Sequence, residues 1–176
     1  PTPETHPDVV EALTRQLNLE AARRVVPAKD TPGFIANRFG MWSMYKAVQV
    51  AEKLGLTIEQ VDEITGPFLG RPRSGSFRLN DIVGIDIMED IARNLIERCP
   101  HDPHTHMLKA PRSLAHLMDK GWIGAKAGQG YYQKHGKELL SLDLVTLAYR
   151  SRQEPDLPTL KQFGRKPLAE RLREGL

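Results

Sequence analysis

The stretch that decides the fold is KDTPGFIANRFGMWSMYKAVQVAEKLG, which runs from Lys29 to Gly55. Apolar residues recur through it at helical spacing and occupy more than one face, which predicts a helix covered on several sides. Thr31 suits the cap position, Pro32 the first helical position, and Gly55 the end. The stretch therefore predicts a mainly α fold, a helical bundle built around one long helix of about 20 residues.

Shorter helices are expected on both sides of this central helix. Thr57 and Gln60 form a capping box, in which each side chain satisfies a free backbone donor of the other residue. Apolar spacing and loop residues give the remaining bounds. The shorter helices are expected over residues 8–23, 57–65, 86–98, 111–120, 159–164 and 168–172.

Strand content is expected to be minor. The β-branched stretch from Arg24 to Lys29 predicts one strand, and Pro27, which has no amide hydrogen, would keep it at a sheet edge. Residues 70–77 are expected as a loop. The glycine-rich residues 121–132 predict a structured turn.

The composition bounds the function classes. A chain of 176 residues with 40% hydrophobic content can bury one main core, and a net charge of +3 does not favour a nucleic-acid partner. No apolar run approaches the roughly 18 residues of a membrane span. The single cysteine, Cys99, excludes an internal disulfide and fits a reducing, cytoplasmic setting. A start at Pro1 in a turn-like stretch predicts a piece of a longer protein.

Three motifs in order carry a resemblance to a known family. They are KDTPGFIANR (29–38), GRPRSGSFRLNDIVGID (70–86) and GWIGAKAGQGYY (121–132). The chain up to about residue 134 resembles the C-terminal domain of 3-hydroxyacyl-CoA dehydrogenases, which implies a fold like the C-terminal domain of 6-phosphogluconate dehydrogenase. Later residues, including LDLVTLAYR, are similar to the extension of long bacterial members that also carry a crotonase-like hydratase region.

The resemblance implies a division of the chain. Residues 1–30 would be the end of an NAD-binding domain and a linker, 31–134 the helical domain, and 135–176 an extension packed on it. The whole enzyme would oxidise 3-hydroxyacyl-CoA to 3-oxoacyl-CoA with NAD in fatty-acid β-oxidation. The NAD site and the catalytic histidine and glutamate would lie in the missing Rossmann domain, so this chain alone would be inactive. Its partners would be the acyl-CoA, that domain and, in a homodimer, a second copy.

The resemblance also implies a site residue, Asn37, which would contact the substrate near its reacting carbon. A neutral amide can hold an oxygen without imposing a unit charge on its surroundings. The alternative is a structural asparagine at a helix start. Phe34, Met41 and Phe77 are candidates for an apolar wall around the acyl chain, and ordinary core packing is the alternative for each of them.

Several other polar or glycine-rich segments are interpreted as structural and not as functional sites. Glu4 and His6 lie in a solvated loop. The glycine string from Gly124 to Gly130 lacks the strand and helix of a phosphate loop, so it is interpreted as a tightly packed turn. The cluster of Cys99, His101, His104 and His106 comes from one short segment, which favours an exposed loop over a metal site.

Two neighbouring pairs of residues have expected structural roles. Arg38 points away from Asn37 on a helix and is expected to pair with Asp81, Asp86 or the missing domain. Asn80 and Asp81 are expected to cap a helix.

Two rival functions stay open at this point. The helical domain of another β-hydroxyacid dehydrogenase would use a catalytic lysine, for which Lys46 is the candidate on a different face from Asn37. A non-catalytic helical interaction module would instead show an exposed apolar patch with no asparagine at its centre.

Overall fold

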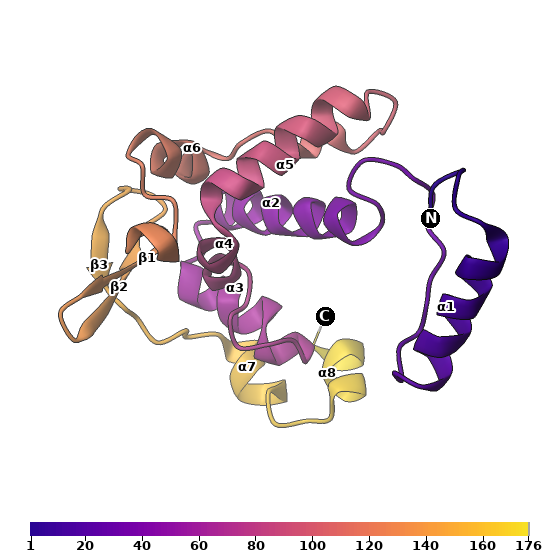
Figure 1. Cartoon of the computed structure of the whole chain (residues 1–176). Coiled ribbons are helices and arrows are strands. Elements are labelled where there is room, and N and C mark those ends of the chain that lie inside the picture. The colour runs from indigo at the N-terminus through magenta and orange to yellow at the C-terminus, as the bar shows by residue number, and fades with distance from the viewer. Residues whose placement is uncertain (176) are drawn as a thin grey trace.

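The computed structural model describes residues 1–175 as a helical body with a small sheet at one side (Figure 1). Helix α2 runs through the middle of the body, α5 crosses it, and α3 and α4 lie on its other side. The α-helices are α1 (Pro7–Leu19), α2 (Ala36–Leu54), α3 (Ile58–Thr65), α4 (Phe77–Val83), α5 (Ile85–Arg98), α6 (Arg112–Asp119), α7 (Pro158–Phe163) and α8 (Leu168–Glu174). The expected mainly α fold around one long helix is confirmed.

Three short 3₁₀ turns connect these helices. They are η1 (Pro67–Leu69), η2 (Thr105–Leu108) and η3 (Ala125–Ala127). The capping box of Thr57 and Gln60 is present at the start of α3. Among the described residues, the structure has no helix with the length and apolar character needed to cross a bilayer.

The core forms where α2, α5, α6 and the sheet meet. Helix α2 buries one stripe of side chains at helical spacing, Met41, Tyr45, Val48 and Ala51. The other buried apolar side chains that pack with them are Ile58, Val61, Phe77, Ile85, Met88, Ala92, Leu95, Leu108, Leu114, Leu117, Tyr131, Tyr132, Leu142 and Leu144.

The sheet has three antiparallel strands in the order β1 (Tyr132–His135), β2 (Glu138–Leu142) and β3 (Tyr149–Ser151). Tyr132 pairs with Ser141, and Leu142 pairs with Tyr149. The first strand follows the glycine-rich turn directly, so the turn and the sheet form one unit.

The edge strand expected from Arg24 to Lys29 is wrong, because these residues form no strand among the described residues. A strand needs a neighbour to receive its hydrogen bonds, and no other strand lies beside this segment. Helix α1 is similarly unsupported, because none of its residues is buried and it stands apart from the body (Figure 1).

Two buried carboxylates fasten the loops to the helices. Asp62 on α3 accepts hydrogen bonds from the backbone N–H groups of Phe77 and Arg78, so it caps α4 from outside. It also accepts one from the hydroxyl of Tyr132, at 2.7 Å. Burial, opposed by these hydrogen bonds, raises the pKa of Asp62 to about 6.

Asp81 on α4 has the matching role for the glycine-rich turn. Its carboxylate accepts hydrogen bonds from the backbone N–H groups of Tyr131 and Tyr132, at 2.7 and 2.8 Å. Burial raises its pKa to about 6 as well. The expectation that Asn80 and Asp81 cap a helix is therefore wrong, since Asp81 binds a different segment and the buried Asn80 amide has no partner within residues 1–175.

Candidate functional site

The start of α2 is shaped by two residues with left-handed backbone conformations. Gly33 has a φ of 74° and Phe34 a φ of 45°. Such angles suit glycine but are uncommon for phenylalanine. They break the helix path before Ala36, so the expected start at Thr31 and Pro32 is wrong, and the turn projects Phe34 and Ile35 outward, each 58% exposed.

Asn37 lies on the first turn of α2, one helical turn before the buried Met41. It therefore continues the stripe that Met41, Tyr45 and Val48 form along the core. Its own side chain is exposed, because the core ends at Met41. Asn37 thus points to the same side as the core but beyond the part that this chain covers.

A hollow of about 500 Å³ opens beside this end of α2. Phe34, Ile35, Phe39 and Trp42 make it mostly apolar, and the rings of Phe39 and Trp42 stack with their centroids 6.4 Å apart. Asn37 does not line this hollow, because it lies on a different face of the helix from Arg38, Phe39 and Trp42. We call the hollow and the exposed first turn that carries Asn37 the open end of α2. The remaining walls of the hollow are polar and come from Arg38, Asp102 and His104.

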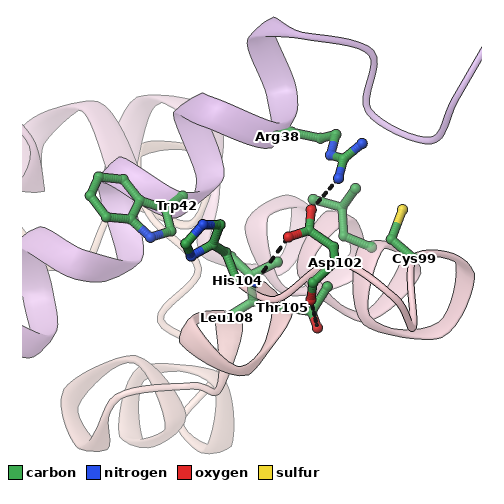
Figure 2. A pocket seen from close by; sticks show the side chains of 8 residues that line it. Arg38, Trp42, Cys99, Asp102, His104, Thr105 and Leu108 are labelled. Carbon is green, nitrogen blue, oxygen red and sulfur yellow. Dashed lines mark hydrogen bonds and ion pairs between the residues drawn. The ribbon is translucent and has the colours of Figure 1, made fainter. Parts of the chain in front are cut away.

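An ion pair holds the open end to the loop before η2. Figure 2 shows the Arg38 guanidinium reaching from α2 to the carboxylate of Asp102, which also accepts a hydrogen bond from the backbone N–H of His104 at 2.9 Å. The His104 hydrogen bond and the Arg38 guanidinium lower the pKa of Asp102. The pairings of Arg38 expected with Asp81 or Asp86 are wrong, because Asp102 takes that place.

The four residues expected from the resemblance fall into two places. Phe34 and Asn37 lie at the open end. Met41 and Phe77 lie in the core, with exposed fractions of 4% and 0%, and Phe77 packs edge-on against Tyr131. The structure therefore does not bring Met41 and Phe77 to the surface of the hollow.

Sequence reasoning missed Ile35 and Trp42 as walls of the hollow. Helical spacing puts Ile35, Phe39 and Trp42 on one face of the helix, so this pattern could have predicted that Ile35 and Trp42 lie beside Phe39. Nothing local in the sequence signalled Asp102, which lies 64 residues after Arg38 and reaches it only through the fold.

The other polar candidates lie away from any cluster. Glu4 and His6 are exposed, and the His6 ring caps the start of α1 by accepting from the N–H of Asp8. Lys46 lies in a groove between α2 and α3. Within residues 1–175, no three histidine, cysteine, aspartate or glutamate side chains gather as metal ligands do.

The glycine-rich string does not fit the phosphates of a dinucleotide. The glycine string from Gly124 to Gly130 contains a three-residue 3₁₀ turn, η3, and is followed by β1, so it has no helix start to receive a pyrophosphate. Gly124 and Gly130 instead pack against Asp81, where a side chain at either position would collide with it. The interpretation of this string as a packed turn is confirmed.

Comparison with known proteins identifies the family. Residues 33–134 match the family model described as the 3-hydroxyacyl-CoA dehydrogenase, C-terminal domain. This chain belongs to that family. The matched range contains the open end of α2, the loops fastened by Asp62 and Asp81, and the glycine-rich turn.

Two curated relatives extend the similarity beyond the family match. A probable 3-hydroxyacyl-CoA dehydrogenase of Bacillus subtilis is 42% identical over 161 residues, which are 92% of this chain and 20% of the relative. A putative fatty acid oxidation complex trifunctional enzyme of Rickettsia prowazekii is 28% identical over 155 residues, covering 85% of this chain and 22% of that protein. The chain therefore spans about a fifth of either relative.

A solved structure of the family has the same fold. The crystal structure of FadB2 from Mycobacterium tuberculosis superposes with a TM-score of 0.63 at 27% identity, over 77% of this chain and 46% of that one. The helical dehydrogenase fold thus accounts for the body around α2.

Proposed function

We propose that this chain is the substrate-binding and interdomain-packing part of an NAD-dependent 3-hydroxyacyl-CoA dehydrogenase that acts in fatty-acid β-oxidation. The observation that carries the proposal is the position of Asn37. It continues the buried stripe of α2 past the end of the core and stays exposed there, while the apolar hollow lies on a neighbouring face of the same turns.

The chemistry of the open end suits an acyl thioester with an oxygen at C3. The Asn37 amide offers two donors and one acceptor, so it can hold either a hydroxyl or a carbonyl oxygen. An uncharged donor preorganised beside an oxygen stabilises the charge that develops there during reaction. Phe34, Ile35 and Phe39 supply apolar wall for the acyl chain.

The proton and hydride chemistry is assigned to residues outside this chain. Since the glycine-rich turn does not fit a dinucleotide, NAD binding and the catalytic histidine and glutamate belong, in this proposal, to a separate nucleotide-binding domain. The similarity to two relatives about five times as long supports a longer parent enzyme. A trifunctional parent with a hydratase-like region is part of the proposal.

Exposed apolar side chains mark where another body would pack. On α1 they form a stripe at helical spacing, Val9, Leu13 and Leu17. Phe39 and Leu79 line a second hollow, and Ile82 and Val83 continue the exposed apolar surface along α4. A nucleotide-binding domain would cover α1 and the open end, which leaves the α4 surface for a second copy.

The test replaces Asn37 with alanine in a full-length enzyme that contains this chain. We expect kcat to fall by about 30-fold to 1000-fold, which corresponds to roughly 2 to 4 kcal/mol of lost transition-state stabilisation. The melting temperature should stay close to that of the parent, because the Asn37 side chain is exposed.

A matched control separates this effect from a general loss. Asn94 is an exposed asparagine on α5, and Asn94→Ala should change neither kcat nor melting temperature. If Asn37→Ala lowers the melting temperature by many degrees and retains normal turnover, Asn37 is structural and the proposed role is wrong.

A further inference from the structure

Another cavity, distinct from both hollows described above, lies between α3, α4, the sheet and the segment that follows β3. Its volume is about 370 Å³, within the range of small-molecule sites. Arginines from three separate segments line it, Arg73 from the loop before α4, Arg78 from α4 and Arg152 from the segment after β3. We call it the arginine cavity.

The three guanidinium groups have no hydrogen bond or ion pair with any of residues 1–175. Two of the carboxylates that share the cavity are already engaged. The Glu59 carboxylate accepts hydrogen bonds from both terminal nitrogens of Arg150, each at 2.8 Å, and from the backbone N–H of Gln153 at 3.0 Å. Asp62 holds the backbone of α4 and the hydroxyl of Tyr132. Guanidinium donors therefore outnumber the acceptors left on the walls, where Glu63 is the remaining acidic side chain.

Buried carboxylates anchor the backbone that carries two of the arginines. Glu59 binds residues on either side of Arg152, so it anchors the segment that carries this arginine. Burial opposes the ionisation of Glu59, but the Arg150 guanidinium brings its pKa down to about 2 and keeps the anchor charged. Asp62 binds the backbone N–H of Arg78, whose guanidinium lies 5.7 Å from the centre of the Tyr132 ring.

We propose that the arginine cavity binds a small phosphate-bearing anion. Planar guanidinium groups match the oxygens of a phosphate in pairs and bind it more strongly than neutral donors do. Anchoring the backbone at Arg78 and on either side of Arg152 lowers part of the ordering cost of binding. Leu139 and Pro155 give the cavity an apolar wall, which suits the organic part of a phosphate ester.

This site is separate from the open end of α2 and does not rest on the proposed function. Arg152, Leu139 and Pro155 lie beyond residue 134, where the match to the family model ends. The arginine cavity is therefore formed jointly by the family domain and the segment that follows it.

Heteronuclear NMR of the 176-residue chain tests the proposal without any activity measurement. Inorganic phosphate is titrated at constant ionic strength, balanced with sodium chloride. We expect saturating shifts in the amides of residues 73–78 and 150–155, with a dissociation constant of about 1 mM or tighter. Arg78→Gln and Arg152→Gln should each weaken binding about tenfold, the loss of one charge-assisted hydrogen bond.

Arg98→Gln is the matched control, because this exposed arginine on α5 lies outside the cavity. It removes the same charge and should leave the affinity unchanged. If Arg78→Gln disturbs the fold, the exposed Arg152 decides the outcome. Shifts that do not saturate, or an affinity that is unchanged in Arg152→Gln, would mean an adventitious ion only and overturn the proposal. Tighter binding of citrate than of phosphate would overturn the assignment to phosphate.

Discussion

The two halves of α2 both carry large apolar side chains but have opposite surroundings. From Met41 to Ala51 the helix buries its stripe among α3, α4, α5 and η2. From Phe34 to Phe39 equally apolar side chains stay more than half exposed. Apolar content alone does not separate the halves. Other elements of this chain bury the second half, whereas the first half contacts mainly the loop that carries Asp102 and His104.

Phenylalanine occurs in both settings and gives the largest expected contrast. Phe77→Ala should lower the free energy of unfolding by about 3 to 5 kcal/mol, because it empties a fully buried site beside Tyr131. Phe34→Ala should change it by less than about 0.5 kcal/mol, since Phe34 is mostly solvated in this chain. Urea denaturation of both variants measures the difference. Equal losses of unfolding free energy would show that Phe34 is as well packed as Phe77.

The buried carboxylates give a contrast that depends on pH. The pKa of Asp81 is raised to about 6 in the folded chain, whereas an unfolded aspartate titrates near 3.9. Its protonated form is therefore favoured by folding. That contribution to stability is complete below about pH 4 and is lost as the pH rises towards 6.

Asp81→Asn removes this titration together with one of the two backbone hydrogen bonds. The variant should be less stable than the parent at every pH, by about 1 to 3 kcal/mol at pH 8. The deficit should grow by on the order of 2 kcal/mol when the pH is lowered to 4. Chemical denaturation at the two pH values checks this, and a deficit that shrinks towards pH 4 would show that Asp81 is charged throughout.

The ion pair at the open end should matter least for stability. Asp102→Asn removes the charge opposite Arg38 and keeps an oxygen for the N–H of His104. We expect a loss of at most about 1 kcal/mol, because the pair is partly exposed to solvent. A loss of several kcal/mol in urea denaturation would instead place Arg38 and Asp102 among the core interactions.

Features that depend on neighbours in the sequence could be predicted. The centre of α2, the capping box of α3, and the helices α5, α6, α7 and α8 follow from apolar spacing and local capping. Asn37 could be placed on the first turn of the long helix, but its exposure depends on where the core ends, which no local pattern shows.

Features that depend on distant partners could not be predicted. The sheet from β1 to β3 forms by pairing strands across turns, and its strands are short and only partly buried. The sequence predicts that Asp81 caps a helix, yet its carboxylate binds the backbone N–H of Tyr131, 50 residues away. Helix α2 begins later than the sequence predicts because Phe34 has a positive φ, a conformation that its residue type disfavours.

The central claim is that the open end of α2 is covered by another part of a longer enzyme and by acyl-CoA. Hydrogen–deuterium exchange compares residues 34–40 with residues 45–51 in the 176-residue chain and in the full-length enzyme. We expect residues 34–40 to exchange at least about tenfold more slowly in the full-length enzyme, and more slowly again with acyl-CoA, while residues 45–51 exchange alike in both. Equal exchange of residues 34–40 in the two proteins, with and without acyl-CoA, would contradict it.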